Sequence, residues 1–254
     1  MTSIAERHKY ILDNIGQKGF VKVADLAEAL GVTPTTIRKD LNILESKGVL
    51  HRAYGSALTS SAPVLDINLN TKRLHHFAEK RRIAQKAVSL VGDNESVIIS
   101  SGSTMAIFAE NLTPKGRLNV VTPAVNIAML LGDVPGITVM QLGGILYGNS
   151  MCVTGVEAVG KLGQLHCSKI FFGADGVDPD AGITCLADEE AELTRKMIAI
   201  SDTAIVLADS SKIGFKGFSR ICQTDEIDII VTDSGISLEN KRRLESLGVK
   251  VIVV

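Results

Sequence analysis

GVTPTTIRKDL, residues 31–41, carries the strongest structural signal in the sequence. Thr33 is a preferred helix N-cap residue, and Pro34 suits the first helical position because its missing N–H would have no helical partner there. Ile37 and Leu41 begin an apolar stripe at the spacing that one face of a helix buries. The pattern predicts a short helix that begins at Pro34 and exposes its opposite face.

Hydroxyl, amide and cationic side chains occupy that opposite face. They are Thr35, Thr36, Arg38, Lys39 and Asn42. An arginine can donate to a guanine edge or to a phosphate, and a threonine can contact a phosphate or a thymine methyl group. The face therefore predicts contact with a DNA groove, and the spacing leaves the individual roles open.

Two further amphipathic segments precede this helix, at residues 7–15 and 23–30. The apolar positions are Tyr10, Ile11 and Ile15 in the first segment and Val23, Leu26, Ala27 and Leu30 in the second. A helix, a short turn around Gly31 and a second helix form the helix-turn-helix arrangement, whose second helix enters the major groove. A three-helix interaction module that does not bind DNA is the alternative.

KGVLHRAYGSAL, residues 47–58, predicts two short strands joined by a turn. Such a wing would lie along the DNA backbone, and its basic character favours DNA binding over the alternative. The predicted DNA-binding residues are Thr33, Thr35, Thr36, Arg38, Lys39, Asn42, His51, Arg52 and Tyr54.

The stretch VADLAEALGVTPTTIRKDLNILESKGVLHRAYGSAL closely resembles the N-terminal winged helix of the DeoR family of bacterial transcriptional regulators. In that family a TIRRDL-like segment marks the recognition helix. The segments SSGST, VVTPAVNIA, QLGGILYGNSMCVTG, KIFFGADGVDPDAGITC and LADSSKIGFKGF resemble, in order, segments of the family's sensor domain. The resemblance implies a sensor similar to ribose-5-phosphate isomerase and glucosamine-6-phosphate deaminase folds that responds to sugar phosphates.

Charge is distributed unevenly along the chain. Residues 1–58 carry eight Lys and Arg against six Asp and Glu, residues 72–86 carry six against one, and residues 87–254 carry thirteen against twenty. A basic front end joined to an acidic remainder indicates two units with different partners. We expect a winged helix-turn-helix domain over 1–58, a linker over 59–71 and an effector-sensing α/β domain over 72–254.

The remainder of the chain alternates between short β-branched runs and helical segments. The expected strands are SVIIS, LNVVT, ITVMQL, KIFFGAD, TAIVLAD, IDIIVTD and KVIVV. This alternation predicts a mostly parallel sheet covered by helices on both faces. The basic stretch 72–86 is expected to form one helix that continues to about Val91, and it either transmits effector binding or adds phosphate contacts.

Ligands of such folds bind beyond the carboxyl ends of the strands. There, SSGSTM brings hydroxyls and backbone N–H groups to a helix N-terminus, an arrangement suited to a phosphate. The predicted effector-binding residues are Ser101, Gly102, Ser103, Thr104, Thr122, Gly143, Gly144, Asp175 and Lys212. Each also has an ordinary explanation, because Ser and Gly cap helices, Asp175 and Asp209 suit capping the next turn, and lysines are common on surfaces.

The sequence departs from the family pattern at three positions near this site. Ser100 stands where the family usually has an aspartate before the SGST-type loop. Pro123 and Ala124 stand where the family commonly has asparagine and serine. The phosphate loop is therefore retained, whereas one carboxylate and one amide are not.

Several classes of cofactor and location are disfavoured. The chain contains no G-x-G-x-x-G and no G-x-x-x-x-G-K-[ST], so we expect neither nicotinamide cofactors nor nucleoside triphosphates, and no cofactor is predicted. The four cysteines form no Cys-x-x-Cys pair, which predicts buried free thiols and no metal site. A charged start and the lack of a long apolar run favour the cytoplasm.

Together these features predict a homo-oligomeric repressor, a dimer or tetramer, that controls a sugar or polyol catabolic operon and is not an enzyme. A phosphorylated sugar would release it from operator DNA. The alternative is an active sugar-phosphate isomerase or deaminase carrying a DNA-binding module, with Asp175, Asp178 or Glu157 as its general base. A nucleotide-sensing Rossmann regulator is a third reading, which lacks its glycine pattern.

Overall fold

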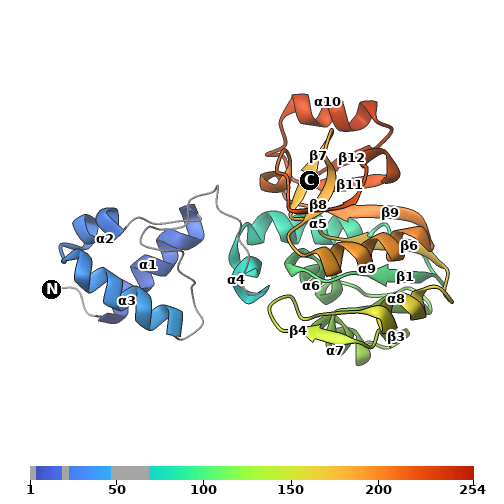
Figure 1. Cartoon of the computed structure of the whole chain (residues 1–254), viewed down its shortest axis with the longest axis horizontal. Helices are drawn as coiled ribbons and strands as arrows, with labels where there is room; N and C mark the ends of the chain where they lie inside the picture. Colours follow the sequence, from blue (N-terminus) through green and yellow to red (C-terminus); the bar gives the residue numbers. More distant parts are fainter. Residues whose placement is uncertain (1–3, 19–22, 47–68) are drawn as a thin grey trace. The chain divides into compact units, whose positions relative to one another are not determined.

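The computed structural model describes residues 4–18, 23–46 and 69–254. The chain forms two compact units, Met1–His75 and His76–Val254 (Figure 1). The wing predicted over 47–58 lies outside the described residues, together with its predicted DNA-binding residues His51, Arg52 and Tyr54.

Four helices are described in the N-terminal unit. They are α1 Ile4–Lys18, α2 Val23–Leu30, α3 Pro34–Ser46 and α4 Leu69–Leu74. The first three share one apolar core, made by Ile11, Leu26, Ala27, Ile37, Leu41 and Leu44. The predicted stripe of α3 is therefore confirmed. The placement of Tyr10 on the apolar face was wrong, because it lies about 100° around the helix from the fully buried Ile11 and is 39% exposed.

The turn between α2 and α3 is a Schellman motif. Gly31 has a φ of +61°, a left-handed conformation that favours glycine. The Val32 N–H donates to the Ala27 carbonyl at 3.0 Å, and the Gly31 N–H donates to the Glu28 carbonyl at 3.2 Å. These bonds end α2 and bring the chain into position to begin α3 three residues later.

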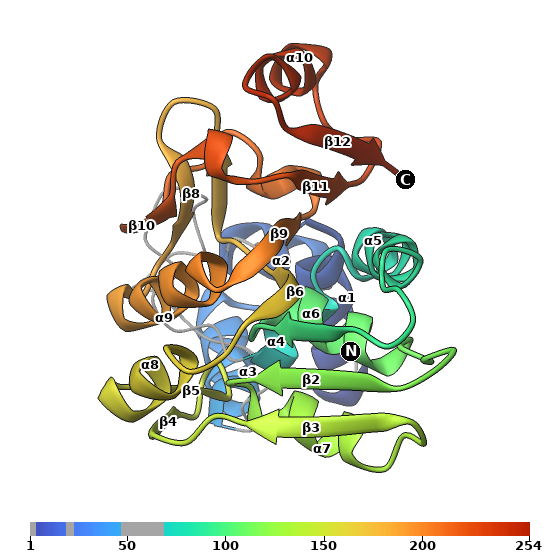
Figure 2. The same ribbon diagram turned by 90° about the vertical axis from the view of Figure 1, so that its right-hand side faces the viewer.

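The C-terminal unit is built on a seven-stranded sheet in which every pairing is parallel (Figure 2). Its order is β12-β11-β9-β6-β1-β2-β3. The strands are β1 Ser96–Ile99, β2 Leu118–Thr122, β3 Ile137–Gln141, β6 Cys167–Phe172, β9 Ser201–Leu207, β11 Ile229–Thr232 and β12 Lys250–Val253. All seven correspond to predicted runs.

Helices cover both faces of this sheet, as predicted. One core contains α5 Phe77–Val88, α6 Ser103–Glu110 and α7 Val125–Gly132, and the other contains α8 Val156–Leu162, α9 Asp188–Ala199 and α10 Leu238–Ser246. Strand residues alternate between the two cores. Ile98 faces α8 and α9, whereas its neighbours Val97 and Ile99 face α5 and α6.

Two smaller sheets were not predicted. The hairpin of β4 Ile145–Tyr147 and β5 Cys152–Thr154 occupies the glycine-rich stretch expected to be a loop. The strands β7 Gly176–Asp178, β8 Gly182–Cys185 and β10 Ser219–Cys222 form a three-stranded antiparallel sheet. None of these five strands is a β-branched run like those that marked the seven parallel strands, so the sequence pattern did not indicate them.

The single helix expected over the basic stretch was also wrong. It is divided at His75–His76 into α4, which ends at Leu74, and α5, which ends at Val88 rather than about Val91. His76 has φ 53° and ψ 38°, a left-handed conformation at the N-cap of α5 that ends the preceding helix.

Candidate DNA-binding face and effector site

The outer face of α3 presents the predicted polar residues to solvent. Thr35, Arg38 and Lys39 are exposed, and Thr36 is half-buried. Beneath them Ile37 is fully buried in the core of the N-terminal unit. The side chain of Asn42 lies outside the described residues. The helix thus presents two cations and a hydroxyl on a face that its core contacts hold in place.

Two of the predicted threonines form the start of the helix. The Thr33 Oγ1 accepts the Thr36 N–H at 3.2 Å and lies 2.9 Å from the Thr36 Oγ1. This is the N-cap bond predicted for Thr33, and it satisfies one of the first N–H groups of α3. Thr33 and Thr36 therefore have a structural role, whatever they contact in a complex.

Asp40 lies on the inner side of α3 and was not singled out from the sequence. Its carboxylate receives two bonds from Arg7, at 2.7 Å from Nε and 3.1 Å from Nη2, and lies 3.3 Å from His8 Nε2. Burial by itself would raise the pKa of Asp40, but the Arg7 and His8 contacts outweigh it and hold that pKa below its usual value. The pair fixes α3 against α1.

The carboxyl ends of all seven parallel strands meet at one edge of the large sheet, here called the carboxyl edge. The strand order reverses between β1 and β6, because the chain proceeds from β1 to β2 and β3 on one side and from β6 to β9, β11 and β12 on the other. Ligands of open α/β sheets bind at such a switch point. The loops after β1 and β6 contain Ser101–Thr104 and Asp175.

The loop after β1 has the features that a bound anion requires. Gly102 is the N-cap of α6, with a φ of +123° and no side chain to bond the first helical N–H groups. Ser101 is half-buried, and Ser103 and Thr104 are buried in the first turn. A Cβ placed on Gly173, after β6, would lie 3.9 Å from the Ser101 carbonyl oxygen, so the two loops lie side by side.

The hairpin reaches the same loop. Burial raises the pKa of the Cys152 thiol of β5 to about 12 and the Glu190 charge adds to that effect, whereas the interaction with Ser101 opposes it. Gly144 lies at the base of the hairpin, where a Cβ would meet the Thr154 carbonyl oxygen at 2.3 Å. Gly144 is thus required for strand packing, and Gly143 beside it is exposed.

The second strand end is occupied by internal contacts. Thr122 is fully buried, and its hydroxyl accepts the Ala124 N–H at 3.1 Å. Pro123 and Ala124 are buried too, and the Pro123 carbonyl accepts the Val153 N–H of the hairpin at 2.8 Å. The positions where the family commonly has asparagine and serine therefore pack against β5 in this chain.

Carboxylates at the other strand ends bind backbone N–H groups. Asp175 Oδ2 accepts the Leu186 N–H at 3.1 Å, and Asp209 Oδ1 accepts the Ser211 N–H at 3.1 Å. Asp233, missed in the sequence, accepts the Ser210 N–H at 2.7 Å and the Gly235 N–H at 2.9 Å. These bonds outweigh burial and hold the pKa of Asp233 below its usual value.

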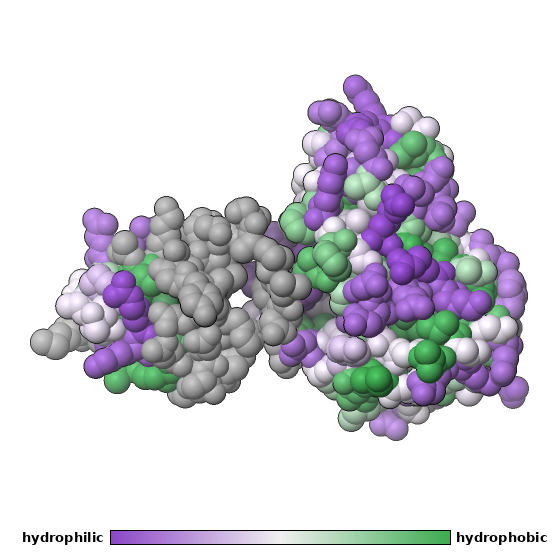
Figure 3. Space-filling view, viewed as in Figure 1, coloured by the Kyte–Doolittle hydropathy of each residue, from purple (hydrophilic) through white to green (hydrophobic). Residues whose placement is uncertain are grey.

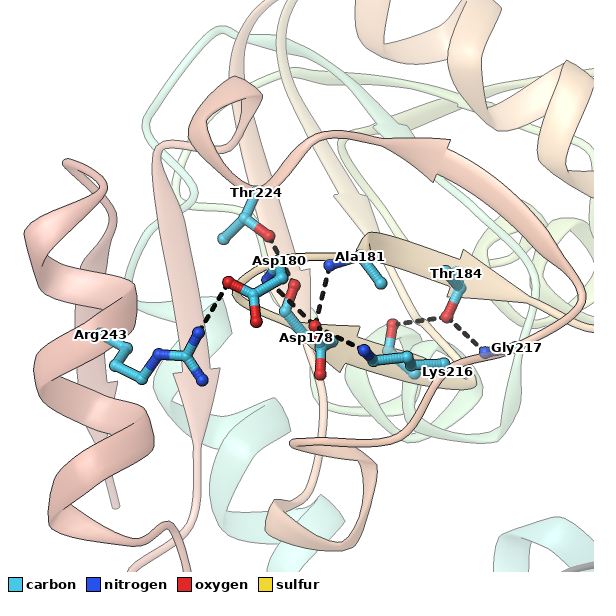
Figure 4. Close-up of polar contacts among 9 residues, drawn as sticks. Asp178, Asp180, Ala181, Thr184, Lys216, Gly217, Thr224 and Arg243 are labelled. Carbon is cyan, nitrogen blue, oxygen red and sulfur yellow. Dashed lines mark hydrogen bonds and ion pairs between the residues drawn. The ribbon is translucent and has the colours of Figure 1, made fainter.

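Lys212 lies on the loop after β9, in the short 3₁₀ helix Ser210–Lys212, and is half-buried. Figure 4 shows the contacts that hold the next part of this loop. Lys216 Nζ lies 3.6 Å from Asp178 Oδ1, and the Gly217 N–H donates to Thr184 Oγ1 at 2.8 Å. The segment after Lys212 is thereby fixed to the three-stranded sheet.

The same network extends to α10. Arg243 Nη2 donates to Asp180 Oδ1 at 2.7 Å, and Thr224 Oγ1 donates to the Asp178 carbonyl at 2.9 Å (Figure 4). Burial by itself would raise the pKa of Asp178, but the N–H groups of Ala181 and Asp180 and the Lys216 charge hold it below its usual value. A carboxylate in this state is a weak base.

The cysteines and the other potential metal ligands of the described residues form no further site. Cys152, Cys167, Cys185 and Cys222 are all buried free thiols, as predicted. In the described parts of the chain no three His, Cys, Asp or Glu side chains are grouped to hold a metal ion. Every helix of those parts is too short or too polar to cross a membrane.

The sequence matches two family descriptions. Residues 7–62 match "DeoR-like helix-turn-helix domain" and residues 75–234 match "DeoR C terminal sensor domain". The "Putative aga operon transcriptional repressor" of Escherichia coli O157:H7 is 33% identical, with 100% of this chain and 95% of that one covered. The HTH-type transcriptional regulator UlaR of Salmonella arizonae is 31% identical, with 98% and 99% covered.

Two solved structures show a weaker likeness to this chain. Ribose 5 phosphate isomerase A from Neisseria gonorrhoeae is 21% identical, covers 58% of this chain and 55% of its own, and gives a TM-score of 0.38. The sorbitol operon regulator SorC from Klebsiella pneumoniae is 12% identical, covers 82% and 90%, and gives 0.34. Because both TM-scores are low, the assignment depends on the sequence matches. The chain belongs to the DeoR family of helix-turn-helix transcriptional regulators.

Proposed function

We propose that the chain represses a sugar or polyol catabolic operon and leaves its operator when a phosphorylated sugar binds at the carboxyl edge. The observation that carries this proposal is the difference between the two faces of α3. Ile37 and Asp40 are buried on one face, and Arg38 and Lys39 are exposed to solvent on the other. The relative named for the aga operon supports a repressor rather than an activator. Operator DNA as the partner places its action in the cytoplasm.

DNA recognition is proposed to follow the helix-turn-helix geometry. The N-terminal turns of α3 would enter the major groove, with Thr35, Arg38 and Lys39 directed at bases and phosphates. Two such helices on two half-sites require at least a dimer, so we propose a homo-oligomer. An effector acts only if it binds the DNA-bound and released arrangements with different affinity.

The effector is proposed to lie at the switch point between β1 and β6. The uncapped N-terminus of α6 at Gly102 provides N–H donors for a phosphate, and Ser101 adds a hydroxyl. Lys212 is the proposed cation from the loop after β9. Asp175, on the loop after β6, is the proposed carboxylate that accepts a hydrogen bond from a hydroxyl of the sugar.

The alternative reading as an isomerase or deaminase receives less support from the candidate bases. Asp178 is held in its ionised form by two N–H groups and Lys216, and Glu157 is exposed on α8. A general base works best when its pKa lies near the working pH. Turnover of any sugar phosphate by the purified protein would reverse this preference.

The test is fluorescence anisotropy on DNA from the promoter region of the protein's own gene, titrated with sugar phosphates and the matching unphosphorylated sugars at fixed salt. Release by one phosphorylated compound is expected. If the protein binds its promoter DNA no more tightly than unrelated DNA, the proposal that it is a regulator is wrong. If it binds the promoter DNA tightly but no phosphorylated compound releases it, the proposed class of effector is wrong.

A matched pair of glycine variants locates the effector. Gly102→Ala adds a methyl group where a phosphate would approach, and Gly248→Ala adds one at a φ of +91° with nothing within 4 Å, in the turn between α10 and β12 at the opposite edge. Both substitutions place a side chain at a positive φ, which costs about 1 to 3 kcal/mol. Only Gly102→Ala should abolish release, and equal release by both variants would contradict the proposed site.

A further inference from the structure

One end of the large sheet has a long uncharged stretch of sequence. Residues 118–156 contain Asp133 as their single charged side chain, whereas 22% charge over these 39 residues would give about nine. The stretch forms β2, β3, α7 and the β4–β5 hairpin. Part of it is buried in the two cores, which explains some of the missing charge but not the rest.

Large apolar side chains of this stretch are exposed. On α7 the exposed fractions are 73% for Met129 and 39% for Leu130, and on β3 Met140 is 38% exposed. On β4 the exposed fractions are 63% for Ile145, 49% for Leu146 and 42% for Tyr147. These six residues are here called the uncharged edge. Figure 3 shows hydrophobic residues among hydrophilic ones at the lower end of the C-terminal unit, where Figure 1 draws β4, β3 and α7.

The six residues belong to neighbouring elements. The hairpin pairs with the start of α7, because the Val125 N–H donates to the Met151 carbonyl at 3.0 Å and Ala124 forms a bridge with Cys152. The last strand of the sheet on this side is β3, which pairs with β2 alone within the described chain. An edge strand flanked by exposed apolar residues is a surface that proteins normally cover.

The opposite end of the sheet is built differently. Beside β12 lies α10, whose nine residues include Glu239, Lys241, Arg242, Arg243 and Glu245. Charges on an edge prevent association. The two ends of the sheet therefore differ in their exposed side chains, which include many charged groups beside β12 and almost none beside β3.

We infer that the uncharged edge is the surface through which two copies of this chain associate. In a two-fold interface the same surface of both copies is in contact, so a charged side chain near the two-fold axis lies close to the identical charge of the second copy. A surface without charge avoids that repulsion and is self-complementary, whereas DNA and anionic ligands require cations. The inference rests on the proposed function in that paired half-sites require a pair of chains.

The test is the mass of the full chain in solution by analytical ultracentrifugation at fixed salt. The single chain has a mass of 27.0 kDa. Wild type is expected at two or more times this value, and Ile145→Glu and Met129→Glu are expected to halve the observed mass. Leu238→Glu is the matched control, since Leu238 is 72% exposed on α10 and should keep the wild-type mass.

Three outcomes would overturn the inference: a wild-type monomer at all concentrations, variants that keep the wild-type mass, or equal dissociation by the Leu238 variant. A monomeric wild type would indicate that the uncharged edge binds a different protein instead of a second copy. If a variant fails to fold, hydrogen exchange of the wild type at high and low concentration decides. The amides of β3 and β4 should gain protection on association, and protection confined to other elements would contradict the inference.

The proposed function fails separately. Wild type that associates through the uncharged edge but has no preference for its promoter DNA would keep this inference and remove the regulator. If the Ile145 and Met129 variants bind promoter DNA and retain the wild-type mass, the proposed function is kept and the inference about the uncharged edge is wrong.

Discussion

The exposed faces of α3 and α7 differ in the type of side chain that they present to a partner. Both helices bury one side, with Ile37 and Leu41 in α3 and Ile127 and Leu131 in α7. The exposed side of α3 offers a hydroxyl and two cations, whereas the exposed side of α7 offers Met129 and Leu130. Cations suit a polyanion and uncharged apolar groups suit a second copy, so the type of exposed side chain is more informative than exposure itself.

The largest expected difference between the two faces is in their response to salt. Raising the salt concentration from about 50 mM to about 200 mM should weaken DNA binding by on the order of a thousandfold, because phosphate contacts release counterions. Self-association through an apolar surface should change little, since the hydrophobic effect does not depend on screening. Anisotropy and ultracentrifugation over the same salt series provide the measurement.

Equal salt dependence of the two processes would contradict the comparison. A control with sodium sulfate sharpens it, because sulfate strengthens apolar association while it weakens contacts with phosphates.

Asp40→Asn tests whether the inner side of α3 supports the outer one. The substitution removes the charged acceptor of two Arg7 hydrogen bonds, and we expect the free energy of unfolding of the N-terminal unit to fall by about 2 to 3 kcal/mol. Chemical denaturation followed by circular dichroism gives the value. Asp25→Asn, an exposed acid in the first turn of α2, is the control and should change stability by less than about 0.5 kcal/mol.

The same variant has a pH signature. The pKa of Asp40 is lower in the folded protein than in the unfolded chain, so its contribution to stability is present above the unfolded pKa of about 4 and is lost as pH falls through the folded value. Asp40→Asn should therefore show less acid destabilisation than wild type. A variant as acid-sensitive as wild type would exclude this role.

Arg38→Ala should weaken binding to promoter DNA by about 2 kcal/mol, or about thirtyfold, because one charged contact to a base or phosphate is lost. Lys115→Ala removes a charge from an exposed position in the C-terminal unit and should bind DNA as wild type does. Direct titration at one salt concentration compares them. Identical losses for both variants would indicate a nonspecific charge effect.

The smallest effect concerns the helix start. Thr33→Ala removes the acceptor of the Thr36 N–H and should lower the free energy of unfolding by about 1 kcal/mol. Thr35→Ala should leave stability within about 0.5 kcal/mol and reduce DNA affinity instead. The two threonines thus separate stability from recognition, and a reversed pattern would show that their assigned roles are wrong.

Much of the fold was accessible from sequence because each strand of the large sheet is a short β-branched run and each is separated by a helical segment. The small antiparallel sheet was not, since its pairing depends on contacts between distant residues. Gly176 shows why: a Cβ there would meet the Phe215 carbonyl oxygen at 2.3 Å, a constraint that exists only after β9 and its loop are in place.

Part of the candidate site could be predicted from the sequence. The N-cap of α3 and the glycine at the start of α6 are local features, so residue type and spacing indicate them. The pairing of Arg7 with Asp40 joins positions 33 residues apart, and no local pattern reveals it. Asp233 was missed for the same reason, because its role depends on the neighbouring loop after β9.

The buried pair of Arg7 and Asp40 has a consequence for how such a regulator acquires new target sequences. Because α3 is held from its inner side by this pair and by Ile37, the positions at Thr35, Arg38 and Lys39 are free to vary without loss of the helix. Under the proposed DNA contacts, exchanging these three surface side chains would change the operator that is recognised while the fold stays the same. A designer who wished to redirect this protein to another operator would randomise those three positions and keep Asp40.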